Sequence, residues 1–244
     1  MLFAPPLIRG TLIQRYKRFF ADVLLDDGRT VTAHCPNPGS MLSVNVPGAE
    51  VWLSPANRPG RTLAFTWELI RAGGVLVGIN TGRTNGLVIE ALNECRIPEL
   101  AGYMSARREV RYGRNSRIDL LLESPGRPTC LVEVKNVTLC RSMQPEISAE
   151  FPDSVTTRGA KHLVELARAV ASGSRCVMLY VAQRADVESL SFASDIDSEY
   201  ARLVRMAADT GVECLCYRCE VDMAGVRLNQ AIPIRMPAQG PAMS

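Results

Sequence analysis

The stretch that decides the fold is Arg117-Ile118-Asp119-Leu120-Leu121-Leu122-Glu123, followed after a short gap by Leu131-Val132-Glu133-Val134-Lys135. Both segments are short, apolar and rich in branched residues, so each is predicted to form a β-strand. Asp119 interrupts the first apolar run. Glu133 and Lys135 lie two residues apart, so their side chains leave the second strand on the same face. A carboxylate among apolar neighbours costs several kcal/mol unless it is paired or binds a metal.

Adjacent strands would bring Asp119, Glu133 and Lys135 to one place. Phosphodiester hydrolysis needs neutralised phosphate charge and an activated water, and Mg²⁺ or Mn²⁺ held by carboxylates supplies both. A lysine beside the metal orients the water or stabilises the transition state. The group therefore predicts a phosphodiester-cleaving centre, and the competing interpretation is a surface ion pair. Glu90, on a predicted helix, is a candidate further metal ligand or part of a solvated helix face.

Length and composition favour a globular protein of one large or two small domains, since the chain has 244 residues and is 47% hydrophobic. No run approaches the roughly 18 apolar residues that a membrane-spanning helix needs. Residues 1–10 lack the sustained apolar region of a signal peptide. We therefore expect a soluble, cytoplasmic protein with no membrane partner.

The eight cysteines are expected to be reduced thiols, several of them packed as small hydrophobes. The spacing of Cys214, Cys216 and Cys219 raises the question of a zinc site. A fourth ligand is not apparent nearby, and the chain has only two histidines. Structural zinc is therefore not favoured.

The first 80 residues read as short strands separated by turns. An extended segment is expected over 12–25, and Asp26-Asp27-Gly28 is a hairpin turn signal that leads into a strand over 29–35. Further strands are expected over three apolar runs: 49–53, 63–69 and 75–79. Such a series suits a small barrel of the OB type.

The pattern changes after residue 80. Asn85 is expected to cap a helix over 86–95, and a strand meander follows over 107–137. A polar loop over 141–156 precedes an amphipathic helix over 157–171. The remaining elements expected are a strand over 175–181, a helix over 197–210 ended by Gly211, and a strand over 212–221. The pattern predicts an α/β domain with a mixed sheet. We divide the chain into 1–80, 81–236 and a frayed tail, 237–244.

Three basic segments point to a polyanionic partner. Arg15, Tyr16, Lys17, Arg18 and Phe19 interleave cations with aromatic rings, as single-strand-binding surfaces do. A second group comprises Arg107, Arg108, Arg111, Arg114 and Arg117. A third, Arg158 and Lys161, lies at a predicted helix N-terminus, which is a natural phosphate site. Each group also fits a solvated face. Nearby His162 is either a general acid or base, or a surface or core histidine.

The chain resembles the sugar fermentation stimulation protein A family over about residues 1–236. The resemblance rests on the following segments: Leu12-Ile13-Gln14-Arg15-Tyr16-Lys17-Arg18-Phe19, His34-Cys35-Pro36-Asn37, Thr66-Trp67-Glu68-Leu69, Ser116-Arg117-Ile118-Asp119, Val132-Glu133-Val134-Lys135, Val137-Thr138-Leu139 and Phe151-Pro152-Asp153. It implies an N-terminal OB-like domain and a C-terminal domain of the PD-(D/E)xK nuclease type. It also implies DNA binding without sequence preference and a regulatory role in maltose or other sugar metabolism.

Within the resemblance, Asp119, Glu133 and Lys135 match the nuclease motif, and Glu90 matches a glutamate often found on the preceding helix. Ile118 stands where the superfamily name has proline. Pro38 follows Asn37 where the family usually has threonine.

Two functions stay open. The first is a Mg²⁺- or Mn²⁺-dependent nuclease with Asp119, Glu133 and Lys135 as catalytic residues and Glu90 as a further metal ligand. The second is a catalytically silent, DNA-binding regulator of sugar (maltose) metabolism genes. In both, DNA is held mainly through its phosphates. The residues expected to contact it are Arg15, Tyr16, Lys17, Arg18, Phe19, Arg117, Arg158 and Lys161. RNA as a partner and the oligomeric state stay open.

Overall fold

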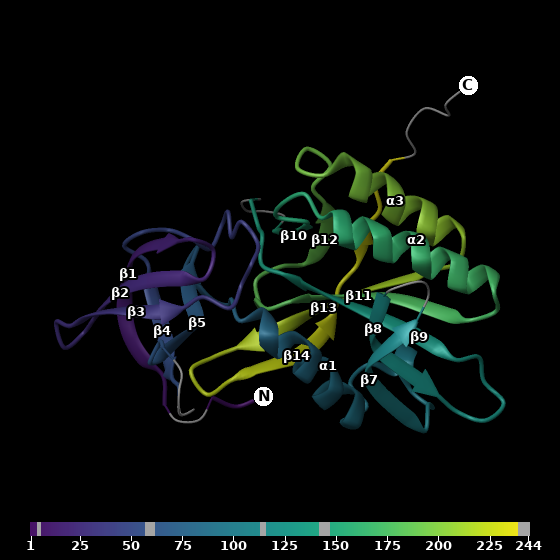
Figure 1. The fold of residues 1–244 in the computed structure, drawn as a ribbon, viewed down its shortest axis with the longest axis horizontal. Helices are drawn as coiled ribbons and strands as arrows, with labels where there is room; N and C mark the ends of the chain where they lie inside the picture. The colour runs from purple at the N-terminus through teal and green to yellow at the C-terminus, as the bar shows by residue number, and fades with distance from the viewer. Residues whose placement is uncertain (4–5, 57–61, 113–115, 142–146, 239–244) are drawn as a thin grey trace.

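The computed structural model describes residues 1–3, 6–56, 62–112, 116–141 and 147–238. Figure 1 shows a β-barrel at one end of the molecule, in purple and blue, and a larger α/β body at the other. No helix in the described ranges is long and apolar enough to cross a membrane. Most of the expected tail, residues 239–244, lies outside the described residues.

The barrel is a single curved sheet whose ends meet. Its strands pair in the order β3-β2-β1-β4-β5-β6, and a parallel contact of β3 with β5 closes the first five. Alternate side chains point inward, so that Leu12, Val23 and Trp67 are almost fully buried in one core. The expected barrel is confirmed. The strands are β1 (Ile8–Tyr16), β2 (Phe20–Leu25), β3 (Thr30–His34), β4 (Glu50–Pro55), β5 (Phe65–Ala72) and β6 (Val75–Gly78).

One prediction in the barrel was wrong. The segment 12–25 is a hairpin rather than one extended stretch, because β1 ends at Tyr16 and β2 begins at Phe20. Lys17 and Arg18 make the turn with φ values of 47° and 64°. The turn contains no Gly, Pro, Asn or Asp, so the sequence has no ordinary turn signal there. The predicted turn at Asp26-Asp27-Gly28 is confirmed, with Gly28 at φ 86°.

The α/β body is built on a six-stranded mixed sheet in the order β14-β13-β11-β9-β8-β7. The three inner neighbours β9, β11 and β13 run parallel, and the remaining pairs are antiparallel. The strands are β7 (Ser105–Tyr112), β8 (Ser116–Glu123), β9 (Cys130–Val137), β11 (Arg175–Ala182), β13 (Glu213–Val221) and β14 (Val226–Ala231).

Helices cover both faces of this sheet. Figure 1 shows α2 (Thr157–Ala171) and α3 (Ser198–Asp209) on one face and α1 (Thr84–Asn93) on the other. The hydroxyl of Thr156 caps α2 by accepting the Gly159 N–H at 3.1 Å. Short 3₁₀ turns occupy Thr81–Arg83 and Pro98–Leu100. The expected mixed-sheet α/β domain, with helices near 157–171 and 197–210, is confirmed.

Two local predictions differ from the structure. Three short strands form a small parallel sheet that was not predicted: β10 (Ser148–Phe151), β12 (Ser189–Phe192) and β15 (Ile234–Arg235). Of these, β10 lies in the segment expected to be a polar loop. Strands this short lack a readable periodicity. In addition, α1 begins at Thr84, so Asn85 lies inside the helix and is not its cap. The division of the chain at residue 80 stays a prediction.

A loop of the barrel is tied to the α/β body by Asp153. The carboxylate of Asp153 accepts the Met41 N–H at 2.9 Å, and its carbonyl accepts the Ser40 hydroxyl. Gly39 makes this approach possible, because a Cβ there would lie 2.5 Å from the Asp153 carboxylate. Ser43 extends the contact by donating to the Thr138 carbonyl at 3.3 Å.

We expect Asp153→Ala to loosen the contact between barrel and α/β body. The Met41 N–H loses its acceptor, which costs about 1–2 kcal/mol of the free energy of unfolding. Urea unfolding followed by circular dichroism measures the loss. Asp26→Ala, at an exposed residue whose nearest cation is 3.7 Å away, serves as the matched control and should change little. Equal stability of the two variants would contradict this role of Asp153.

Candidate functional site

The site forms where β8 and β9 separate. Their pairing runs from Leu122 opposite Cys130 to Leu120 opposite Val132 and then stops. Beyond that point the Val134 N–H is accepted by Asp119 Oδ2 at 2.8 Å. Asn85 of α1 donates its amide to Oδ1 of the same carboxylate at 2.9 Å. Asp119 thus replaces a missing strand partner and is held at the point of divergence.

Glu133, on β9, is held by one carboxylate oxygen. The residue is 2% exposed. Its Oε1 accepts a hydrogen bond from Lys135 Nζ at 2.6 Å and also contacts His162 Nδ1. Within the described residues its Oε2 is buried without a hydrogen-bond partner. One oxygen therefore fixes the side chain, and the other is available to a water or a ligand.

The two carboxyl groups are shifted in opposite directions. Burial, followed by the negative charge of Glu133, raises the pKa of Asp119, against the hydrogen bonds from Val134 and Asn85. Burial also opposes ionisation of Glu133, but the contact with His162 and the charge of Lys135 outweigh it and lower the pKa of Glu133. The charge of Glu133 thus contributes to the raised pKa of Asp119.

His162 closes the cluster from α2. It is 3% exposed, and its Nδ1 lies 3.5 Å from Lys135 Nζ as well as against Glu133. Arg158, one helical turn earlier, approaches its Nε2 at 3.4 Å. The sequence left the role of His162 open, and a lone histidine on a helix carries no spacing signal. Asn85 was missed for a related reason, because its position near the helix start favours a cap.

Glu90 lies away from this cluster. Its carboxylate accepts a hydrogen bond from the Met1 ammonium group at 2.6 Å and lies 3.5 Å from Arg96. The same ammonium group donates to the carbonyl of Val226 in β14, the edge strand three strands away from β9. The structure therefore does not group Glu90 with Asp119 and Glu133. On α1 it is Asn85 that reaches the site.

Exposed cations lie on the two elements, β8 and α2, that carry Asp119 and His162. Arg158 and Lys161 are exposed on the first turns of α2, and Lys161 Nζ is 3.7 Å from Glu165. Arg117 lies two residues before Asp119 on β8 and is paired in register with Arg111, and both are exposed. Like charges placed opposite each other repel, and a bound polyanion relieves that repulsion. Arg114 lies outside the described residues.

The barrel residues expected to contact DNA fall into two groups. Lys17, Arg18 and Phe19 are exposed at the β1–β2 turn. Arg15 instead donates to the carbonyls of the 36–41 loop, at 2.9 Å for Asn37 and 2.8 Å for Gly39. Tyr16 stacks on Phe20, with ring centroids 5.5 Å apart, and donates to Asp22.

The cysteine cluster does not converge. Cys214 and Cys216 pack in the core under α2 and α3, whereas Cys219 packs in the core under α1. The sheet separates them after a register shift between Arg218 and Cys219. Burial raises the pKa of Cys214 and of Cys219 to about 12, which keeps both as neutral thiols.

The donor set of the site suits a hard divalent cation. The described part of the chain contains no group of three His, Cys, Asp or Glu side chains arranged to hold a metal. Mg²⁺, however, keeps several waters and is bound through one or two carboxylates. The unpartnered Oε2 of Glu133 and the carboxylate of Asp119 meet that requirement.

The opposite pKa shifts predict opposite effects on stability in metal-free buffer. Asp119→Asn removes a charge whose folded-state pKa is raised, so unfolding midpoints should rise at pH 7. That gain should fade as the pH falls toward 3.8, the usual pKa of an aspartate.

Glu133→Gln removes a carboxylate whose folded-state pKa is lowered. The variant should be less stable at pH 7, and its deficit should shrink as the pH falls below 4.5. Calorimetry between pH 3 and 8 tests both, and a shift of the same sign in the two variants contradicts the assignment.

Comparison with known proteins assigns the family. A model of the sugar fermentation stimulation protein RE domain matches residues 82–225, and one of the SfsA N-terminal OB domain matches residues 13–79. A sugar fermentation stimulation protein homolog of Rhodospirillum rubrum is 52% identical over 245 residues, covering 97% of this chain and all of that protein. The homolog of Paramagnetospirillum magneticum is 55% identical over 228 residues, covering 93% and 95%.

The fold is also that of a solved structure, Pyrococcus furiosus SfsA in complex with Ca²⁺. The two chains superpose with a TM-score of 0.85 at 24% identity, and the match covers 96% of this chain and 98% of the other. The barrel is therefore an OB domain, as expected, and the α/β body is that of SfsA. This chain belongs to the sugar fermentation stimulation protein (SfsA) family.

Proposed function

We propose that this protein is a divalent-metal-dependent nuclease that binds DNA without sequence preference and hydrolyses its phosphodiester bonds. The observation that carries the proposal is the state of Glu133. Lys135 and His162 hold one of its carboxylate oxygens, while the other is buried and has no hydrogen-bond partner among the described residues. An unsatisfied buried carboxylate oxygen is costly and is retained where a ligand satisfies it.

Each residue of the cluster has a distinct task in this proposal. Asp119 and Glu133 hold Mg²⁺ or Mn²⁺, which when bound neutralises phosphate charge and lowers the pKa of a water. Lys135 places its ammonium group beside Glu133, where it stabilises the negative charge that develops on the phosphate. His162 is a positioning residue, because it acts on Glu133. The Ca²⁺ in the P. furiosus structure supports a divalent cation, since Ca²⁺ and Mg²⁺ share a preference for oxygen ligands.

The surrounding cations provide the DNA contact. Arg117, Arg158 and Lys161 are exposed around the cluster, and Lys17 and Arg18 are exposed on the barrel. Contacts to phosphate give affinity and position but carry no sequence information, which fits binding without sequence preference. A DNA-binding regulator without cleavage would use the same surface, so the measurement of cleavage decides between the two functions.

We expect Lys135→Ala and Asp119→Asn to reduce Mg²⁺- or Mn²⁺-dependent cleavage of DNA at least 100-fold, the cost of removing a charged transition-state contact. Binding measured with Ca²⁺ should change only a few-fold, because other cations make most phosphate contacts. Glu90→Gln is the matched carboxylate control and should cleave like the wild type. If Lys135→Ala and Asp119→Asn cleave DNA like the wild type, the nuclease proposal is wrong. If those variants still bind DNA, the DNA-binding regulator is the function that remains.

Cation binding is testable without catalysis. Ca²⁺ at 100 times its dissociation constant should add about 2.7 kcal/mol to the free energy of unfolding. In a chain of this size that amounts to a rise of about 5–10 °C in the midpoint of thermal unfolding. Glu133→Gln should lose most of this rise and Glu90→Gln should keep it. A rise of equal size in both variants would place the cation elsewhere.

A further inference from the structure

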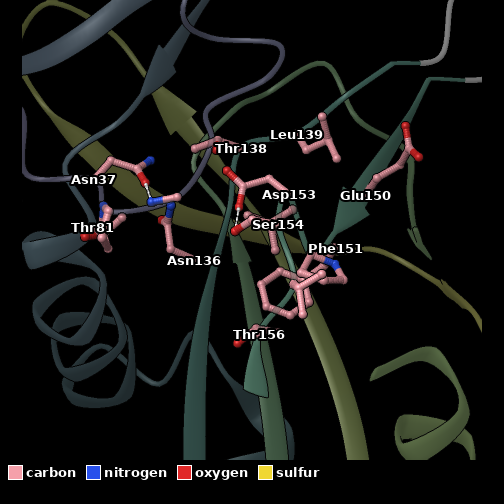
Figure 2. Close-up of a pocket in the computed structure, with 15 residues that line it drawn as sticks. Asn37, Thr81, Asn136, Thr138, Leu139, Glu150, Phe151, Asp153, Ser154 and Thr156 are labelled. Carbon is pink, nitrogen blue, oxygen red and sulfur yellow. Dashed lines mark hydrogen bonds between the residues drawn. The ribbon is translucent and has the colours of Figure 1, made fainter. Parts of the chain in front are cut away.

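A pocket of about 260 Å³ lies between the barrel and the α/β body, beside the carboxylate cluster. Figure 2 shows Asn37 and Asn136 on one side of it and Leu139 and Phe151 on the other. Asn136 directly follows Lys135 on β9, and Thr156, also in the lining, caps the helix that carries His162. The pocket therefore adjoins β9 one residue beyond Lys135, on the opposite face of the strand from the Lys135 side chain, and it contains residues from both domains.

Asn37 presents a free amide to this pocket. Its Oδ1 accepts the Gly39 N–H at 2.9 Å, and this hydrogen bond assigns the orientation of the amide group. Its Nδ2 donates no hydrogen bond to any described residue, although the residue is only 3% exposed. A donor group that lines a pocket and has no acceptor among the described residues is free to bind a ligand.

Asn136 presents a second free amide from the other domain. Its Oδ1 accepts from Gln183 Nε2 at 2.6 Å and from the Thr84 hydroxyl at 3.1 Å. The orientation of Gln183 is fixed in turn, because its Nε2 also donates to the Asn80 carbonyl at 3.2 Å. The Nδ2 of Asn136 donates to no acceptor within the described chain. Two amide donors thus face a pocket that supplies neither with a partner.

The charge and polarity of the other lining residues indicate which kind of group the two amides bind. Among its described residues there is no Lys or Arg, whereas Glu150 and Asp153 are acidic, so a phosphate is disfavoured. Leu139, Phe151 and Pro152 supply apolar surface. The volume lies below the roughly 300 Å³ at which pockets for drug-sized ligands begin. A small, flat, uncharged group that carries hydrogen-bond acceptors fits these conditions, and the edge of a nucleobase has them.

We infer that the pocket receives one unstacked nucleobase of the strand whose phosphate lies at Asp119, Glu133 and Lys135. This inference rests on the proposed function and names its substrate class. The preferred nucleic acid has at least one unpaired nucleotide at the cleavage point, because a base inside a duplex cannot enter a pocket without leaving its stack. The amides of Asn37 and Asn136 donate to the acceptors of that base.

Binding of short strands to the full-length protein in Ca²⁺ tests the inference without cleavage. The probes are an eight-nucleotide thymidine strand and a fully abasic strand of the same length and charge, each with an end label for fluorescence anisotropy. Wild-type protein should bind the thymidine strand about 10-fold more tightly. Asn37→Asp keeps the acceptor for the Gly39 N–H but removes the donor. This substitution should weaken binding of the thymidine strand about 5-fold more than binding of the abasic strand, which is the effect of one hydrogen bond.

Two further variants secure the result. Asn93→Asp places the same added charge at the end of α1, outside the pocket, and should affect both strands equally. Ser154→Leu fills the pocket and should remove the preference for thymidine even if Asn37→Asp proves unstable. If Asn37→Asp and Ser154→Leu weaken binding of both strands equally, the pocket is not a base site. The nuclease proposal would still stand in that case. If the wild-type protein binds neither strand, the inference fails, and binding of duplex DNA in the same assay decides whether the DNA-binding proposal stands.

Discussion

The separation of β8 from β9 is the constraint on which the site depends. Two neighbouring strands in a sheet normally satisfy each other's backbone groups, and here the pairing ends at Leu120 and Val132. The Asp119 carboxylate accepts the Val134 N–H, which would otherwise lack a strand partner. A side chain that replaces a backbone acceptor is held as rigidly as the strand itself.

The cluster is stabilised locally and remains electrostatically incomplete. Lys135 and His162 meet on one oxygen of Glu133, and this contact is strong enough to lower the pKa of a nearly buried carboxyl group. Asp119 lacks such a cation and has a raised pKa. A buried pair of carboxylates with one nearby ammonium group repels itself, so a further positive charge would stabilise the arrangement. Under the proposed function, that charge comes from the bound metal ion.

Contact between the two domains places a second chemical environment beside the first. The loop that Asp153 holds also carries Asn37, and β9 carries Asn136 directly after Lys135. Neither domain alone contains both amides. A Cβ at position 39 would lie 2.5 Å from the Asp153 carboxylate, so a larger residue there would displace that side chain. A polar cluster suited to a charged backbone therefore adjoins a mostly uncharged pocket, as a nucleotide with a phosphate and a base requires.

The sequence by itself determined the two-domain order, the barrel, the mixed sheet and the convergence of Asp119 with Glu133 and Lys135. Those features follow from alternation, helical periodicity and the placement of charge in apolar strands, all of which are local. Only the tertiary structure decided the partners of that cluster. Asn85, rather than Glu90, reaches it from α1, and His162 reaches it from α2. Which face a helix turns to a sheet depends on packing that short segments do not encode. The small β10-β12-β15 sheet and the interdomain pocket escaped prediction for the same reason, because each is made by residues far apart in the chain.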